Sequence, residues 1–110
     1  MDYPITWPVF LLDGGDVMFA TGGAEFNQNF EEPDLFDPRH ELLDACGHRL
    51  EIEKWTGFLL PARRSPDPPD PDHLADVLRE FLRASMQQVS DTEPLESLVA
   101  RVTAGKPTRR

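Results

Sequence analysis

The chain has 110 residues, of which 20 are acidic and 11 basic, and its formal net charge at pH 7 is −9. This length suits one domain with one core, large enough to fold without metal ions or disulfides. The negative charge argues against direct binding to nucleic acid or to an anionic membrane surface, because phosphate groups would be repelled. No apolar stretch approaches the roughly 18 residues that cross a bilayer, so no membrane partner is expected.

The cysteine content and the first residues indicate a cytoplasmic protein. Cys46 is the only cysteine, so no disulfide can form within the chain. Residues 1–4 show neither the basic region nor the apolar region of a secretory leader. Both features favour a reducing compartment. No feature indicates a cofactor or an oligomeric state.

The acidic residues are unevenly distributed along the chain. Residues 1–60 contain twelve acidic and three basic side chains, whereas residues 61–110 contain eight of each. The whole net charge therefore falls on the first part. Such a field attracts a basic protein surface, although solubility alone accounts for it equally well.

The first elements expected are two strands joined by a tight turn. Residues 7–12 and 17–20 are apolar and flank the turn sequence DGGD, a strong hairpin signal. The first strand is apolar on both faces, which predicts a central position in a sheet. In residues 21–30, Phe26 and Phe30 are spaced i, i+4, so a short helix capped by Thr21 could dock both rings on the sheet.

An acidic loop follows this helix. Four carboxylates surround Leu35 and Phe36 in residues 31–37. An apolar anchor within a charged rim is typical of a recognition surface for a basic partner. In the alternative interpretation, Leu35 and Phe36 pack into the core while the carboxylates are solvated. The candidate partner-binding residues are Glu31, Glu32, Asp34, Phe36 and Asp37, with Asp13 and Asp16 as further candidates.

A second hairpin is expected around Cys46 and Gly47. Its strands are residues 41–45 and 48–53, and the alternation in the second strand separates two faces. His48, Leu50 and Ile52 fall on one face, and Arg49, Glu51 and Glu53 on the other. Residues 55–60 predict a turn followed by a fifth short strand. Residues 1–60 thus predict a β-rich part, an antiparallel meander of four or five strands.

The remaining chain predicts a proline-rich linker and two helices. Residues 61–71 contain five prolines and favour an extended spacer. Asp70 can cap a helix with Pro71 at its first position, and a second helix begins near residues 90–92 and stops at Gly105. The apolar stripes are Leu74, Val77, Leu78, Phe81 and Leu82, then Leu95, Leu98, Val99 and Val102. The prediction is a single α+β domain over residues 1–110, in which a meander packs against two C-terminal amphipathic helices (72–104), followed by a basic tail (105–110).

No catalytic or metal-binding constellation is apparent. His40, Cys46 and His48 lie within nine positions, but C-x-H is not a standard zinc-ligand spacing and no second cysteine pair exists. An acidic neighbourhood without a helix N-terminus would raise the pKa of the Cys46 thiol and reduce its reactivity. We therefore expect no catalytic residue, no metal ion and no enzymatic activity.

Three segments carry a resemblance to other proteins. They read "WPVFLLDGGDVMFA", "FEEPDLFD" and "ELLDACGHRLEI", with matching motifs at residues 12–14, at residues 31–34 and at residues 44–47 with Leu50. The chain resembles a group of small uncharacterised bacterial proteins, members of which look like immunity proteins of toxin systems. The resemblance implies an α+β sheet with C-terminal helices and carries no catalytic residue over.

The expected function is non-enzymatic protein binding. An immunity-type inhibitor would use its acidic surface to block a basic protein partner, such as a toxin. One alternative is an acidic nucleic-acid mimic, or a regulator of a DNA-binding protein, that uses the same charges. Another is a small enzyme whose site the sequence does not disclose, which would require an enclosed pocket lined by His48 and carboxylates.

Overall fold

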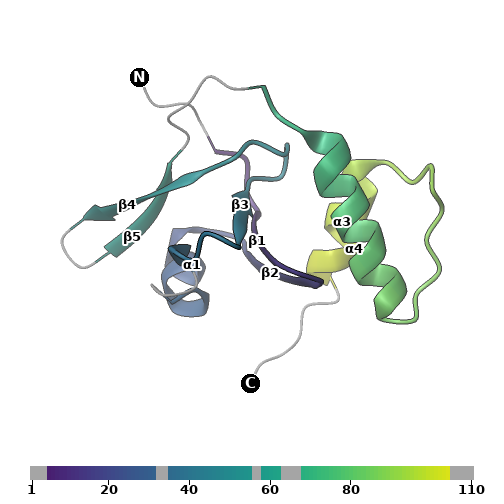
Figure 1. Ribbon diagram of the computed structural model, residues 1–110, viewed down its shortest axis with the longest axis horizontal. Helices are drawn as coiled ribbons and strands as arrows, with labels where there is room; N and C mark the ends of the chain where they lie inside the picture. The colour runs from purple at the N-terminus through teal and green to yellow at the C-terminus, as the bar shows by residue number, and fades with distance from the viewer. Residues whose placement is uncertain (1–4, 32–34, 56–57, 63–67, 105–110) are drawn as a thin grey trace.

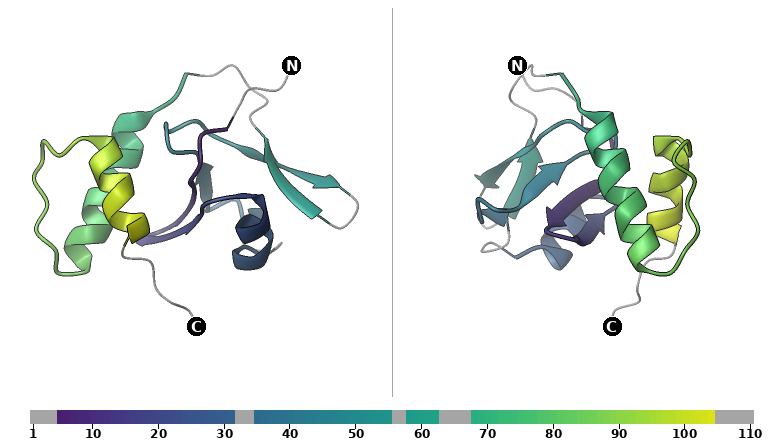
Figure 2. Two further views of the ribbon diagram at one scale, coloured as in Figure 1. Left: turned by 180° about the vertical axis from the view of Figure 1, so that it is seen from behind. Right: turned by 45° about the vertical axis from the view of Figure 1, so that its right-hand side comes forward.

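The protein is an α+β structure with antiparallel strands and, in the described residues, three helices (Figures 1 and 2). This computed structural model describes residues 5–31, 35–55, 58–62 and 68–104, with the backbone alone at 53–55, 58–60 and 62. The strands are β1 (Val9–Asp13), β2 (Asp16–Ala20), β3 (Glu41–Leu43), β4 (Glu51–Trp55) and β5 (Phe58–Ala62). The helices are α1 (Gly23–Asn29), α3 (Pro71–Ala84) and α4 (Leu95–Ala104).

The first hairpin is confirmed. β1 pairs with β2 from Val9 opposite Ala20 to Asp13 opposite Asp16. Gly14 has a φ of 63°, in the left-handed region where a residue without a Cβ is favoured. The DGGD sequence therefore forms the turn that its composition predicts.

β1 is the central strand of a three-stranded sheet with the order β2-β1-β3, as its two apolar faces predict. Val9, Phe10, Leu11 and Leu12 are all buried. Phe10 and Leu12 belong to a core shared with α3 and α4, whereas Val9 and Leu11 belong to a second core that contains Phe26 of α1. The sheet is therefore covered on both faces, by the C-terminal helices on one side and by α1 on the other (Figure 1).

A single meander of four or five strands is not confirmed. After β3, the returning chain makes one bridge, Leu43 opposite Arg49, flanked by two hydrogen bonds: the Asp44 N–H donates to the His48 carbonyl, and the Leu50 N–H donates to the Leu42 carbonyl. β4 then leaves the first sheet and pairs with β5 in a separate two-stranded sheet. Residues 44–48 form a three-residue hairpin connection: the Gly47 N–H donates to the Asp44 carbonyl, and Gly47 has a positive φ. The pairing with β3 ends after the one bridge.

Helix α1 docks Phe26 and Phe30 as the i, i+4 spacing predicts. Both rings are buried, and they meet edge to face with centroids 4.9 Å apart. The predicted cap is wrong: Gly22 occupies the capping position without a side-chain bond. Thr21 instead donates its backbone N–H and hydroxyl to the Glu25 carboxylate, at 2.6 and 3.0 Å.

Helix α3 begins as predicted, and α4 begins later than predicted. The Asp70 side chain accepts a hydrogen bond from the His73 N–H at 3.1 Å, and Pro71 opens the helix. Leu74, Leu78 and Leu82 of the predicted stripe are fully buried. α4 starts at Leu95, not at residues 90–92, because Pro94 disfavours helical geometry in the residue before it and suits a helix start.

The structure also places parts of the predicted linker. Residues 61–62 belong to β5, with Pro61 opposite Ile52, and residue 71 belongs to α3. Residues 68–70 are exposed. The predicted tail at residues 105–110 and residues 63–67 of the linker lie outside the described residues.

The loop after β3 packs directly on the start of α3. Gly47 has a φ of 88°, and its carbonyl accepts the Asp70 N–H at 3.0 Å. A Cβ at Gly47 would lie 2.7 Å from the carbonyl carbon and oxygen of Asp70, and 2.8 Å from the Pro71 nitrogen. These neighbours are backbone atoms, so they cannot yield by a side-chain rotation.

We therefore expect Gly47→Ala to lower the free energy of unfolding by about 2 kcal/mol or more, from left-handed strain plus the collision with α3. Gly15→Ala is the matched control, because Gly15 has no atom within 4 Å of the added Cβ and no positive φ. Its effect should stay within about 0.5 kcal/mol. Urea denaturation measures both values, and equal values for the two variants would contradict the packing described.

Candidate functional site

A cavity of about 380 Å³ lies between the loop at residues 35–38, strand β3 and the start of β4. Its apolar lining comes from both sheets and from the loop: Leu11, Leu35, Phe36, Pro38, Leu42, Leu50 and Ile52. Its polar lining consists of Asp37, His40, Glu41, Arg49 and Glu51. An apolar floor with a charged rim is the usual composition of a recognition site.

Two predicted site residues, Phe36 and Asp37, line this cavity. Leu35 is half-buried against the core that contains α1, whereas Phe36 is 54% exposed. Leu35 therefore packs against the core, as the alternative interpretation expects, whereas Phe36 does not. Glu31 is exposed. Glu32 and Asp34 lie outside the described residues.

Asp37 is held by its neighbour Arg39. The guanidinium donates to both carboxylate oxygens, at 3.1 and 2.8 Å, and the Arg39 N–H donates at 2.9 Å. These hydrogen bonds hold the pKa of Asp37 well below its ordinary value. Arg39 is 84% exposed, so the pair is solvated. Asp37 therefore stays anionic.

A third predicted site residue, Asp13, lies near Asp37 because both contact His40. Its Nε2 lies 3.1 Å from an Asp13 carboxylate oxygen and 3.7 Å from an Asp37 oxygen. Asp13 and Asp16 face each other across the end of the first hairpin, and both are exposed. The structure thus gathers Asp13 and Asp37 around one imidazole, with Asp16 beside them on the turn.

Glu41 links the cavity rim to the C-terminal helices. One carboxylate oxygen lies 2.7 Å from His73 Nε2 on α3, and the other accepts from Arg49 at 3.3 Å. The hydrogen bond from His73 is the largest cause of a lowered Glu41 pKa, and partial burial opposes it. The contact joins β3 to α3 across 32 positions of the sequence.

The arginines of the helical part do not neutralise the acidic residues of the first part. In the described portions of the chain, their ion pairs are Arg79 with Asp76, Arg83 with Asp91, and Arg101 with Glu93. All six partners lie beyond residue 70. These three arginines therefore do not offset the acidic residues of the first 60 positions.

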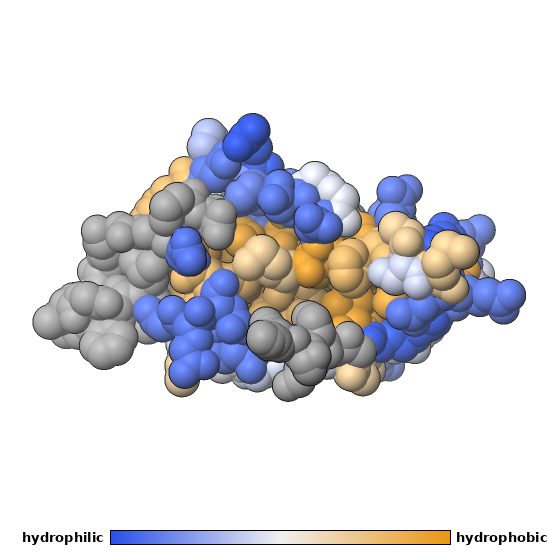
Figure 3. Space-filling view, turned by 90° about the horizontal axis from the view of Figure 1, so that it is seen from below, coloured by the Kyte–Doolittle hydropathy of each residue, from blue (hydrophilic) through white to orange (hydrophobic). Residues whose placement is uncertain are grey.

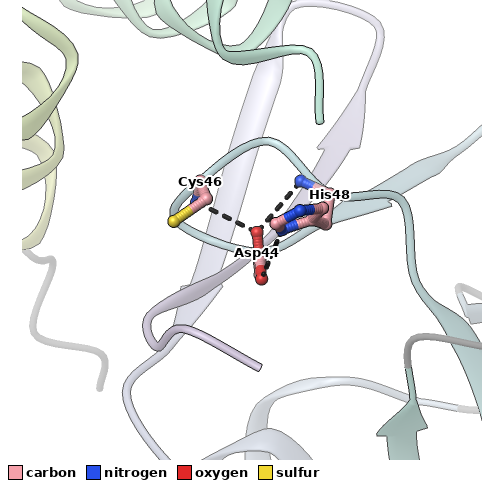
Figure 4. Close-up of side chains that lie close together, drawn as sticks. All are labelled: Asp44, Cys46 and His48. Atoms are coloured by element: carbon pink, nitrogen blue, oxygen red, sulfur yellow. Dashed lines mark hydrogen bonds and ion pairs between the residues drawn. The ribbon is translucent and has the colours of Figure 1, made fainter. Parts of the chain in front are cut away.

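The loop between β3 and β4 is organised by Asp44, whose side chain is fully buried. One carboxylate oxygen accepts the N–H groups of Cys46 and His48, at 2.9 and 3.0 Å (Figure 4). The other accepts the Thr6 N–H at 3.2 Å and lies 3.3 Å from His48 Nδ1. The sequence does contain a local indication of this turn, because Asp44 stands three residues before Gly47, a pattern typical of Asx-type turns. The sequence draws attention to Cys46 and His48, whereas the role of Asp44 becomes visible only in the structure.

Comparison with protein-family models, with curated proteins and with solved structures finds no match for this chain. Within the described ranges, none of the helices has the length and apolar character needed to cross a membrane.

The lowered Glu41 pKa predicts a pH-dependent contribution to stability. An acid whose folded-state pKa lies below its ordinary value of 4.5 stabilises the fold above that pH, and the stabilisation is lost as the pH falls through the folded-state pKa. Glu41→Gln should therefore cost about 0.5–1 kcal/mol near neutral pH and little in strong acid.

Chemical denaturation of the wild type and the variant at several pH values measures this difference. Glu51→Gln is the control, because Glu51 is exposed and has no ion pair among the residues that the structure describes. A Glu41→Gln difference that stays constant from neutral to acidic pH would contradict the contact with His73.

Proposed function

We propose that this chain is a non-enzymatic binding module, an immunity-type inhibitor that acts in the cytoplasm and blocks a basic protein toxin. The observation that carries the proposal is the cavity beside residues 35–38, where the exposed Phe36 stands next to carboxylates. Aromatic anchors beside charged groups carry much of the energy in protein interfaces.

The charge distribution supports a cationic partner. Asp16, Glu31 and Glu51 are exposed and make no ion pair among the described residues. Because the helical arginines are paired with acids of their own part, these carboxylates keep their field. That field would raise the association rate with a basic surface and disfavour phosphate ligands.

The cavity suits a long basic side chain. The stem of a lysine or arginine would lie on Leu42 and Leu50, while its charged end would reach Glu41 or Glu51 on the rim. Apolar side chains also gather at the centre of the face seen in Figure 3, bordered by hydrophilic ones. Contiguous apolar surface of this kind often marks interaction sites, and apolar contacts would set the dissociation rate.

The proposal predicts a matched pair of charge reversals. In Glu31→Lys/Glu51→Lys, the association rate with the partner toxin should fall about tenfold or more at low salt, because the steering field is reversed. In Glu80→Lys, on the exposed side of α3, it should fall much less. Stopped-flow or surface-based kinetics across salt concentrations measures both rates.

The partner for this test is the toxin encoded beside the gene of this chain, produced with it in a host that the toxin kills. The wild type and Glu80→Lys should restore growth, and the double reversal should restore it poorly. Circular dichroism shows that each variant is folded. An affinity that does not change with salt, or equal losses for the two variants, would refute the acidic surface as the binding site.

A further inference from the structure

The loop between β3 and β4 brings three different donor groups together. A carboxylate oxygen of Asp44, the sulfur of Cys46 and an imidazole nitrogen of His48 all lie within 4.8 Å of one another (Figure 4). The cluster is separate from the cavity described above, since none of its residues lines that cavity.

We propose that Asp44, Cys46 and His48 bind one zinc ion, with the fourth coordination position open to solvent. The combination of sulfur, nitrogen and oxygen donors suits zinc, whereas magnesium and calcium prefer oxygen ligands alone. Three protein ligands with an open fourth position are a recognised arrangement for zinc. This zinc site does not depend on the proposed toxin partner.

The separation of His48 and Asp44 fits this coordination. Nδ1 of His48 lies 3.3 Å from the second carboxylate oxygen of Asp44. A charge-assisted hydrogen bond is shorter, about 2.7–2.9 Å. Tetrahedral bonds of about 2.0–2.1 Å from zinc to nitrogen and oxygen put those two atoms about 3.3 Å apart. An ion can therefore be bound between them without a change in their spacing.

The sulfur needs only a small movement. With a zinc–sulfur bond of about 2.3 Å, the sulfur would lie about 3.5 Å from the other two donors. No donor pair is farther apart than 4.8 Å, and Cys46 is exposed. The thiol lies 3.5 Å from the Thr6 hydroxyl, a weak contact that ion binding can replace.

The rest of the site is already held in place. Two backbone N–H groups bind one oxygen of Asp44, and the other oxygen accepts the Thr6 N–H and lies 3.3 Å from His48 Nδ1. The loop is fixed in turn by Gly47, which donates its N–H to the Asp44 carbonyl and accepts the Asp70 N–H. Because these bonds orient the ligands before an ion arrives, ion binding would order few further groups.

The electrostatics also favour a cation. Asp44 is fully buried, and within the described residues its only ion-pair partner is His48. Three backbone N–H groups stabilise this carboxylate, and a divalent ion would add the positive charge that no arginine or lysine of the described residues supplies.

The test is titration of the chelator-treated full chain with Zn²⁺ by calorimetry, and with Co²⁺ by absorption spectroscopy. We expect one ion per chain, with tetrahedral Co²⁺ bands and a thiolate-to-cobalt charge-transfer band. Cys46→Ser should abolish the charge-transfer band, and Cys46→Ser and His48→Gln should each weaken zinc binding about tenfold or more. Affinity should rise with pH, because the thiol and the imidazole must lose protons.

The matched control is His73→Gln, which removes a histidine near the loop but outside the cluster. It should bind zinc as the wild type does. Cys46 is exposed and His48 is partly exposed, so their variants should fold, which circular dichroism checks. No ion uptake by the folded wild type, a charge-transfer band that persists in Cys46→Ser, or an equal loss in His73→Gln would each overturn the proposal.

Discussion

The constraint on which this structure depends is the burial of β1 on both faces. Its residues Val9 to Leu12 have no polar side chain, so a cover is needed on each side of the sheet. The helices α3 and α4 cover one side, and α1 covers the other. Residues 35–38, which precede β3, form one wall of the cavity, and Leu35 packs against the second core. The candidate binding site is thus a consequence of how the second core is closed.

The Asp44 loop is the second organising feature, because it joins the sheet to α3. A buried carboxylate that accepts three backbone N–H groups can shape a loop that has no regular secondary structure. Gly47 then allows the backbone to approach Asp70 and Pro71, and the Glu41–His73 contact lies beside it. The same hydrogen bonds that stabilise the loop fix the positions of the three donor atoms proposed to bind zinc.

In the described residues, the ion pairs of the helical arginines stay within the helical part and do not involve the acids of the first 60 residues. Solvated pairs of this type contribute little to stability. Their bearing on the proposed binding role is that they do not occupy the carboxylates at the cavity rim. The proposed binding site and the proposed zinc site use different residues and can be tested separately.

The sequence by itself determined the elements whose signals are local. The DGGD turn, the unbroken apolar run of β1, and the Asp70–Pro71 start of α3 each depend on neighbouring residues, and each is present in the structure. Only the tertiary structure decided that β4 pairs with β5 rather than continuing the first sheet, and that Asp44 is buried between Thr6 and His48. It also decided that His40 lies between Asp13 and Asp37. These features depend on contacts between residues that are distant in the chain or on the direction of a loop, and no local periodicity encodes either.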